Sequence, residues 1–271
     1  MILTEDKKII QENLSKTLPE IVTLLSKRYT KKEIKNYCDN HNLRYKHLSS
    51  HERSEIQKSK ILTKQREQTP VNYNYFKVWS KNMAYIFGLW CADGCIYSQN
   101  KGYYWCITLK EDDEYLLKQI DEEMQCQHKL YKNRHCYRLL FSCKTIYQDI
   151  ISLGGKEAKS LTLKFPYVPK QYLSHFIRGY FDGDGSVSQR GNTGCLIGTY
   201  EFCKQLNIIL KRNGINISSI KEKHPELCSN TYCLNIFKKE DFRKFSEFIY
   251  SDMDEKSLYL YRKRNRNTTV S

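Results

Sequence analysis

The sequence predicts an α+β protein made of two similar halves that follow a small helical domain. A stretch ending in Asp-Gly occurs twice, at residues 86–94 and 177–185. Strand-like and helix-like hydrophobic patterns follow each copy in the same order. The first 47 residues contain only helix-like patterns. We therefore expect three short helices, and then two halves that each run helix-strand-strand-helix-strand-strand-helix.

The composition indicates a nucleic-acid partner. The 271 residues include 45 Lys and Arg against 30 Asp and Glu, which gives a net charge of +15 and a pI near 9.2. Such an excess of positive charge favours a polyanion such as DNA. The longest apolar run, near residues 83–92, is too short to span a bilayer, so a membrane protein is excluded.

Eleven cysteines raise the question of disulfides. Their spacings form no paired Cys-x-x-Cys sets, and the N-terminus does not resemble a signal peptide. We therefore expect reduced thiols in a cytoplasmic protein, without zinc.

Residues 1–47 are expected to form the helical domain. Thr4 and Pro19 mark the starts of two helices, and Thr30 caps a third over residues 31–40. The three helices resemble a helix-turn-helix module whose third helix has a basic outer face. Its predicted DNA-binding residues are Lys31, Lys32, Lys35, Asn36 and Arg44. The alternative is a helical docking domain with a solvated lysine face.

Residues 48–75 are polar and charged, and they predict a basic linker or a lone solvated helix. Along DNA, its lysines would contact phosphates without reading sequence.

The repeated stretch predicts a close pair of helices. Small residues recur in it at helical spacing, as Gly88 with Ala92 and as Gly179 with Gly183. They leave a flat stripe on which a second helix can approach closely. Pairing would bring together Asp93 and Asp184, each at the negative end of its helix dipole. The alternative is a pair used only for packing, with both aspartates as solvated caps.

Two carboxylates in that position favour a bound divalent cation with oxygen ligands. Carboxylates beside a scissile phosphate are also what metal-assisted phosphodiester hydrolysis requires. The repeated stretch is therefore the candidate active site.

The elements expected after the two copies match one another. After the first copy we expect strands at 95–98 and 103–110, a helix at 112–124, strands at 129–133 and 136–142, and a helix at 145–153. After the second copy we expect strands at 186–189 and 194–199, a helix at 201–213, strands at 217–223 and 231–237, and a helix at 241–250. The alternation along 103–110 predicts sheets with one buried and one polar face.

At these residues the sequence resembles the LAGLIDADG homing endonucleases, in the form with two motifs in one chain. The resemblance covers about residues 76–266 and divides them into halves at 76–170 and 171–271, the second with a basic tail. It implies a pseudo-twofold symmetric monomer whose antiparallel sheets form a saddle over double-stranded DNA. The acid two positions before the catalytic one is Asp182 in the second copy, but Cys91 replaces it in the first.

The resemblance also implies site residues. Asp93 and Asp184 would be catalytic and would bind two or three Mg²⁺ ions, with the carbonyls of Ala92 and Gly183 as further ligands. A lysine after each half lies near the scissile phosphates in the family. The repeated Lys-Ser-Leu makes Lys159 and Lys256 the candidates. Each could instead cap a helix C-terminus. Further predicted DNA contacts are Lys110, Arg138, Arg262 and Arg264.

The predicted function is site-specific double-strand cleavage of DNA at a long asymmetric target, leaving short 3′ overhangs. A non-cleaving DNA-binding regulator or an RNA-splicing maturase on the same fold is the alternative, and retention of both aspartates and both lysines argues against it. An intein is less favoured, because Met1 is no splicing nucleophile and the chain does not end in His-Asn. Usage rich in Lys, Asn, Ile and Tyr favours an AT-rich phage or bacterial genome, with the protein near the host nucleoid and its gene free-standing or within an intron.

Overall fold

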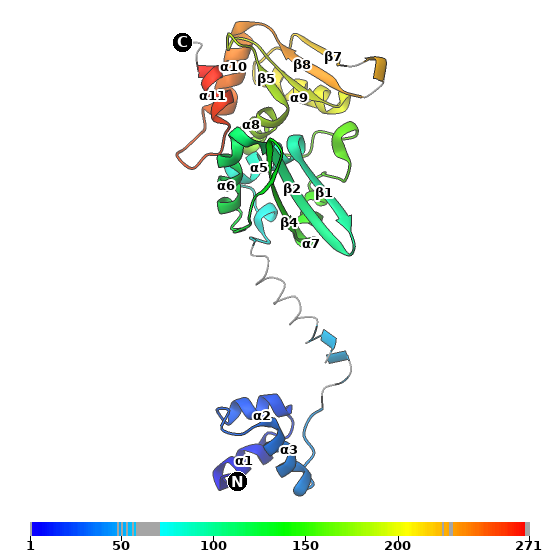
Figure 1. Ribbon diagram of the computed structural model, residues 1–271, viewed down its shortest axis with the longest axis vertical. Helices are drawn as coiled ribbons and strands as arrows, with labels where there is room; N and C mark the ends of the chain where they lie inside the picture. The colour runs from blue at the N-terminus through cyan, green and yellow to red at the C-terminus, as the bar shows by residue number, and fades with distance from the viewer. Residues whose placement is uncertain are drawn as a thin grey trace. The chain divides into compact units, whose positions relative to one another are not determined.

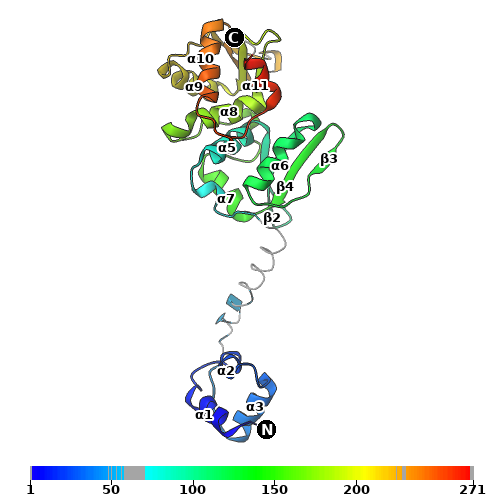
Figure 2. The same cartoon turned by 90° about the vertical axis from the view of Figure 1, so that its left-hand side faces the viewer.

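The computed structural model describes residues 2–47, 49, 51–52, 54–55, 57, 71–223, 225–227 and 230–268. The chain divides into two compact units, Met1–Gln68 and Thr69–Ser271 (Figures 1 and 2). None of the helices in the described ranges combines the length and the apolarity needed to cross a membrane.

The N-terminal unit contains three short helices, as predicted. They are α1 (Thr4–Glu12), α2 (Leu18–Leu24) and α3 (Lys31–Asn40). At the start of α3 the Thr30 hydroxyl accepts from the Glu33 backbone N–H, and the Glu33 carboxylate accepts from the Thr30 N–H at 2.7 Å. This capping box satisfies two backbone donors that the helix leaves without partners. A core of fully buried aliphatic residues joins the helices, including Ile10, Ile21 and Ile34.

The predicted linker at 48–75 is too long at its C-terminal end. Val71 and Tyr75 are each only 8% exposed and pack into the core of the second unit. The Asn72 N–H also donates to the Met124 carbonyl at 2.9 Å. The second unit therefore begins before residue 76. Most of the linker lysines lie outside the described residues.

The second unit contains the predicted element order twice. The first half has α5 (Lys81–Asp93), β1 (Gly94–Gln99), β2 (Gly102–Lys110), α6 (Glu114–Glu123), β3 (Tyr131–Asn133), β4 (Cys136–Ser142) and α7 (Lys144–Ser152). The second half has α8 (Leu173–Asp184), β5 (Gly185–Val187), β6 (Gly194–Gly198), α9 (Tyr200–Arg212), β7 (Ser219–Glu222), β8 (Tyr232–Ile236) and α10 (Lys239–Tyr250). The predicted α+β fold class is confirmed.

Each half forms one antiparallel four-stranded sheet, with strand orders β1-β2-β4-β3 and β5-β6-β8-β7. Along β2 the predicted alternation holds for Trp105, Ile107 and Leu109, which are buried, and for Thr108, which is partly exposed. Cys106 departs from it, because it is buried although the pattern places it on the polar face. Helices α6 and α7 pack against this sheet (Figures 1 and 2). On the polar face, Thr108 of β2 lies opposite Arg138 of β4.

Helices α5 and α8 form the centre of the unit. A Cβ atom added to Gly179 would lie 2.0 Å from the Tyr85 carbonyl oxygen, and one added to Gly88 would lie 2.0 Å from the Phe176 carbonyl oxygen. The two backbones thus approach too closely for any side chain at either glycine. This close contact shows that the two repeated stretches pair, as predicted.

One disulfide corrects the expectation of reduced cysteines. Cys95 of β1 lies opposite Cys106 of β2, with a Cα–Cα distance of 5.3 Å, and their sulfur atoms are bonded. Strand register brings the two side chains within disulfide range, which the spacing of 11 residues did not reveal. The eight other described cysteines are present as thiols.

The chain after α10 packs on both halves. We call residues 252–263 the C-terminal strap; its end begins α11 (Tyr261–Thr268). The Asn82 amide of α5 donates to the Lys256 carbonyl at 3.0 Å, and the Tyr261 N–H donates to the Tyr115 hydroxyl at 2.7 Å. The expected basic tail therefore includes helix α11. Hydrogen bonds attach the strap to the first half.

Candidate active site

The paired helices end with their aspartates close together. Asp93 is the last residue of α5 and Asp184 is the last residue of α8. A Cβ atom added to Gly183 would lie 3.0 Å from the Asp93 carboxylate. Burial and the negative charge of Asp93 raise the pKa of Asp184 to about 6. Two carboxylates that repel one another in this way form a site that favours a cation.

Lys159 lies beside the end of α5. It belongs to the short 3₁₀ turn Lys159–Leu161 and is only 5% exposed. Its Nζ atom donates to the Ala92 carbonyl at 3.2 Å and lies 5.3 Å from the centre of the Trp90 ring. Burial lowers the pKa of Lys159, while the charges of Asp184 and Asp93 act in the opposite direction. The turn thus places an ammonium group beside the two aspartates.

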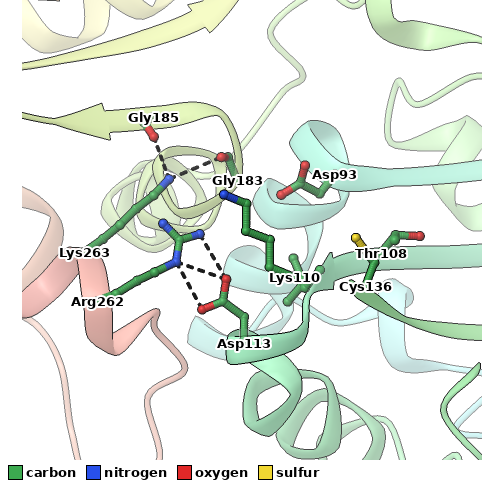
Figure 3. Close-up of a pocket in the computed structure, with 10 residues that line it drawn as sticks. Asp93, Thr108, Lys110, Asp113, Cys136, Gly183, Gly185, Arg262 and Lys263 are labelled. Atoms are coloured by element: carbon green, nitrogen blue, oxygen red, sulfur yellow. Dashed lines mark hydrogen bonds and ion pairs between the residues drawn. The ribbon is translucent and has the colours of Figure 1, made fainter. Parts of the chain in front are cut away.

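Lys263 lies in the same way beside the end of α8 (Figure 3). Its Nζ atom donates to the carbonyls of Asp182 and Gly185, both at 2.6 Å, and of Gly183 at 3.2 Å. It also lies 5.4 Å from the centre of the Phe181 ring. Burial lowers the pKa of Lys263 to about 8.

Lys263 is therefore the spatial counterpart of Lys159. Lys159 contacts the Ala92 carbonyl, just before Asp93, and lies near the Trp90 ring. Lys263 contacts the Gly183 carbonyl, just before Asp184, and lies near the Phe181 ring. Each also caps carbonyls at a helix C-terminus. The candidate catalytic position and the capping role, considered as alternatives for each lysine, are therefore compatible with one another.

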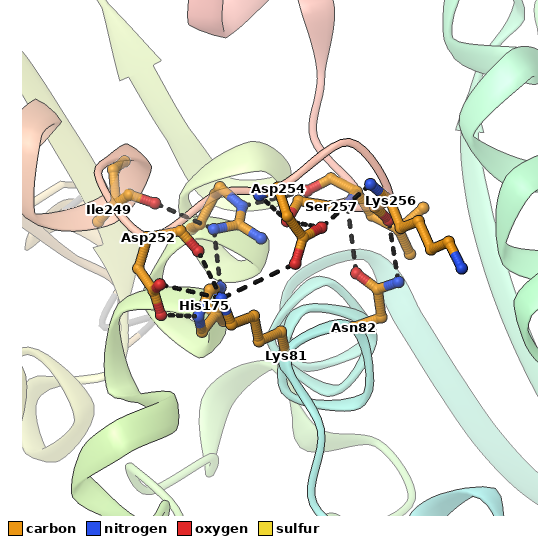
Figure 4. Close-up of polar contacts among 10 residues, drawn as sticks. Lys81, Asn82, His175, Ile249, Asp252, Asp254, Lys256 and Ser257 are labelled. Atoms are coloured by element: carbon orange, nitrogen blue, oxygen red, sulfur yellow. Dashed lines mark hydrogen bonds and ion pairs between the residues drawn. The ribbon is translucent and has the colours of Figure 1, made fainter.

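Lys256 is not at this site, so that assignment is corrected. Its side chain is exposed, and its carbonyl accepts from Asn82 near the N-terminal end of α5 (Figure 4). Helix α5 has 13 residues, so about 18 Å separates this end from Asp93. The Lys-Ser-Leu repeat was misleading because the strap inserts extra residues before the lysine that reaches the site.

The carbonyls of Ala92 and Gly183 are also poor candidates for metal ligands. Each accepts a hydrogen bond from a lysine ammonium group, whose charge would repel a cation at the same oxygen. No group of three or more His, Cys, Asp or Glu side chains that could hold a metal occurs within the described residues. The carboxylates of Asp93 and Asp184 remain as the candidate ligands. Two carboxylates are enough for Mg²⁺, which usually completes its coordination with water and substrate phosphate oxygens.

A pocket of about 360 Å³ opens beside Asp93 (Figure 3). Lys110 lines it from the end of β2, and Lys263 lines it from α11. Arg262 also lines it and makes a two-pronged contact with the Asp113 carboxylate, with Nε at 3.0 Å and Nη2 at 3.0 Å from Oδ2. The pocket thus brings three cationic side chains to the carboxylate at the end of α5.

Comparison with known proteins identifies the second half. Residues 171–250 match the family model described as the LAGLIDADG-like domain. These residues form a LAGLIDADG-like domain. The matched residues include α8, which ends at Asp184 and packs against α5.

Similar proteins include one curated sequence and several solved structures. The chain is 27% identical over 184 residues to a probable translation initiation factor IF-2 of Methanocaldococcus jannaschii, which covers 63% of this chain. The chain spans only 15% of that protein. A mesophilic variant of the homing endonuclease I-DmoI has a TM-score of 0.49 at 17% identity and covers 71% of this chain and 98% of its own. The meganuclease I-SmaMI bound to DNA has a TM-score of 0.49 at 9% identity and covers 69% and 88%.

The predicted DNA-contacting residues lie on several surfaces of the two units. Arg138 is exposed on β4, where its Nε donates to the Thr108 hydroxyl at 3.1 Å. Both line a second cavity of about 470 Å³ near the β3–β4 turn. The Arg264 guanidinium lies 4.6 Å from the centre of the Tyr259 ring. In the N-terminal unit the predicted contacts are all exposed: Lys31, Lys32, Lys35, Asn36 and Arg44.

Sequence reasoning missed Lys263 and Asp113. Lys159 follows Asp93 by 66 positions, whereas Lys263 follows Asp184 by 79, so a search at equal spacing does not find it. Asp113 lies in the acidic run at residues 111–114, and the local sequence does not distinguish it from the other acids of that run. Only the packing of the strap distinguishes it.

Proposed function

We propose that this chain is a site-specific, divalent-metal-dependent homing endonuclease that cuts both strands of a long asymmetric DNA target. The observation that carries the proposal is the clustering of two helix-terminal aspartates with two buried lysines at one end of the LAGLIDADG helix pair. The net charge of +15 supports a DNA substrate.

The carboxylates of Asp93 and Asp184 would hold Mg²⁺, which fits this all-oxygen donor set. When bound, the metal would lower the pKa of a water molecule and stabilise the departing 3′ oxygen. The two carboxylates also orient the attacking water by accepting its hydrogen bonds. Water adds to phosphorus and the P–O3′ bond breaks, leaving a 3′ hydroxyl and a 5′ phosphate.

Lys159 and Lys263 serve the charge that develops at the reacting phosphate. Attack by water increases the negative charge on the non-bridging oxygens, and a preorganised ammonium group stabilises that charge. Both side chains are held by carbonyl contacts, so little reorganisation is needed during the reaction. Each lysine would serve one strand together with the aspartate beside it.

The remaining surfaces would bind the duplex. The polar faces of the two sheets would lie along the major groove, with Lys110 and Arg138 among the contacts. The N-terminal unit would add a second DNA contact through the exposed basic face of α3. The protein would act as a monomer, because one chain contains both halves of the site.

The test is cleavage of a complex DNA library with Mg²⁺ and, separately, with EDTA, followed by sequencing of every new end. We expect recurrent ends at one long site that depend on Mg²⁺ and disappear in the Asp184→Asn variant, which still binds DNA. A site that is bound but never cut would contradict the endonuclease and support a regulator. Retained binding to a structured intron RNA would instead support a maturase.

A further inference from the structure

Immediately before Lys263, the C-terminal strap makes hydrogen bonds to both halves. The Leu260 N–H donates to the Asp182 carboxylate of α8 at 2.8 Å. The Tyr261 N–H donates to the Tyr115 hydroxyl of α6 at 2.7 Å. The Arg262 guanidinium group then donates to the Asp113 carboxylate, which lies in the turn between β2 and α6. Leu260 is thus anchored to the second half, and the next two residues are anchored to the first half.

The Asp113 contact is the one best suited to fix the position of Lys263. Asp113 has only 2% of its side chain exposed, and both of its carboxylate oxygens accept from Arg262. A two-pronged pair of charged groups restrains direction as well as distance. Since Arg262 directly precedes Lys263 in the first turn of α11, a shift of the arginine would also shift the lysine.

We propose that Asp113 and Arg262 are positioning residues for Lys263, so that one of the two strand cleavages depends on a contact between the halves. Asp113 of the first half holds the strap through Arg262, and the strap holds the Lys263 ammonium group at the end of α8 in the second half. The cut that uses Lys263 therefore depends on both halves. This inference rests on the proposed endonuclease function.

The other lysine is held differently, which makes the inference testable. Lys159 lies in a turn that follows α7, in the same half as the Ala92 carbonyl that it contacts. Loss of the Asp113–Arg262 pair should therefore impair one strand only. A misplacement of about 1 Å can slow an enzymatic step by about 100-fold, so we expect that strand to be cut about 10- to 100-fold more slowly.

The experiment measures the cleavage rate of each strand in an end-labelled duplex that carries the target found in the library. The variants are Asp113→Asn and Arg262→Met, compared with Lys263→Met and Lys159→Met. Exposed neighbours supply the matched controls Asp112→Asn and Lys256→Met. We expect Asp113→Asn and Arg262→Met to slow the same strand as Lys263→Met and to accumulate nicked DNA. Lys159→Met should slow the other strand, and the controls should cut both strands at the wild-type rates.

The two variants also separate positioning from electrostatics. Asp113→Asn removes a negative charge and Arg262→Met removes a positive one, so an effect of charge alone would change the rate in opposite directions. Equal slowing of both strands, opposite changes or no change would each overturn the inference. If Arg262→Met does not fold, Arg262→Lys, which keeps one cationic donor, should slow the same strand by a smaller factor. A wild-type protein that cuts neither strand would overturn the proposed function itself.

Discussion

At the scale of single residues, burial determines how the charged groups of the helix pair can act. Lys263 is only 5% exposed, but its ammonium group reaches four carbonyl oxygens at the end of α8. The carbonyls of Asp182 and Gly183 lie in the last turn of α8, where no further helical turn supplies a donor, so the lysine compensates them while it remains beside Asp184. An exposed lysine such as Lys256 lacks this preorganisation and would lose more side-chain entropy on binding a phosphate.

His175 supplies a prediction about pH at the same scale. It is fully buried; its Nδ1 accepts from Arg178 at 3.0 Å, and its Nε2 donates to the Asp252 carboxylate at 3.1 Å (Figure 4). Burial and the positive charges of Arg178 and Lys81 lower the pKa of His175, although Asp252 opposes them. The native imidazole is therefore neutral where the unfolded one becomes protonated, so stability falls as pH drops below the unfolded value near 6.5.

The measurement is the free energy of unfolding from urea titrations at pH 7.5 and pH 5.5. The contribution of His175 is at most about 1.4 kcal/mol per pH unit. We expect the fall in stability between the two pH values to be smaller in His175→Gln than in wild type. An equal or larger fall in the variant would show that His175 is not held neutral. Acids that titrate in the same range contribute to both proteins and cancel in the difference.

At the scale of elements, the α5–α8 contact controls the geometry of the site. The helices touch through backbone at Gly88 and Gly179, so their distance is set by main-chain atoms that cannot rearrange. This contact sets how near Asp93 lies to Asp184. Helix α8 also holds the strap, because Arg178 donates to the Leu258 carbonyl at 3.1 Å.

Gly179→Ala should therefore be strongly destabilising. The new methyl group would lie 2.0 Å from the Tyr85 carbonyl oxygen, and overpacking against backbone costs about 3 kcal/mol or more. Gly214→Ala is the matched comparison, because its φ of +73° is strained for alanine but nothing lies within 4 Å of the new atom. We expect a loss of only about 1 kcal/mol there. Denaturant unfolding measures both, and equal losses would contradict the close helix contact.

At the scale of the whole molecule, two units would share the work of binding DNA. The exposed lysines of α3 belong to the N-terminal unit, whereas the two aspartates belong to the α5–α8 helix pair of the second unit. Such a division separates affinity from chemistry, because phosphate contacts made far from the reacting bond strengthen binding without changing the chemical step.

This division predicts a change in salt dependence. Each lost phosphate contact reduces the slope of log affinity against log salt concentration by about 0.9, so Lys31→Ala with Lys35→Ala should reduce it by about 2. The control is Lys8→Ala with Lys16→Ala, two exposed lysines outside α3 that should leave the slope unchanged. The single-turnover cleavage rate at saturating protein should be the same in all three proteins. An unchanged slope in the α3 variant would exclude that helix as a DNA contact.

The sequence by itself determined the duplicated α+β architecture, the helix pair and the acids at its end. These features depend on local patterns, namely small residues at helical spacing, alternating strands and a terminal Asp-Gly, which recur at 91-residue separation. Only the tertiary structure decided which lysine completes the second half of the site. The strap that carries Lys263 is held by the contact between Arg262 and Asp113, which are 149 residues apart in the chain, and such a long-range contact leaves no periodic signal. The Cys95–Cys106 disulfide was missed for the same physical reason, since strand register rather than residue spacing brings its two sulfur atoms together.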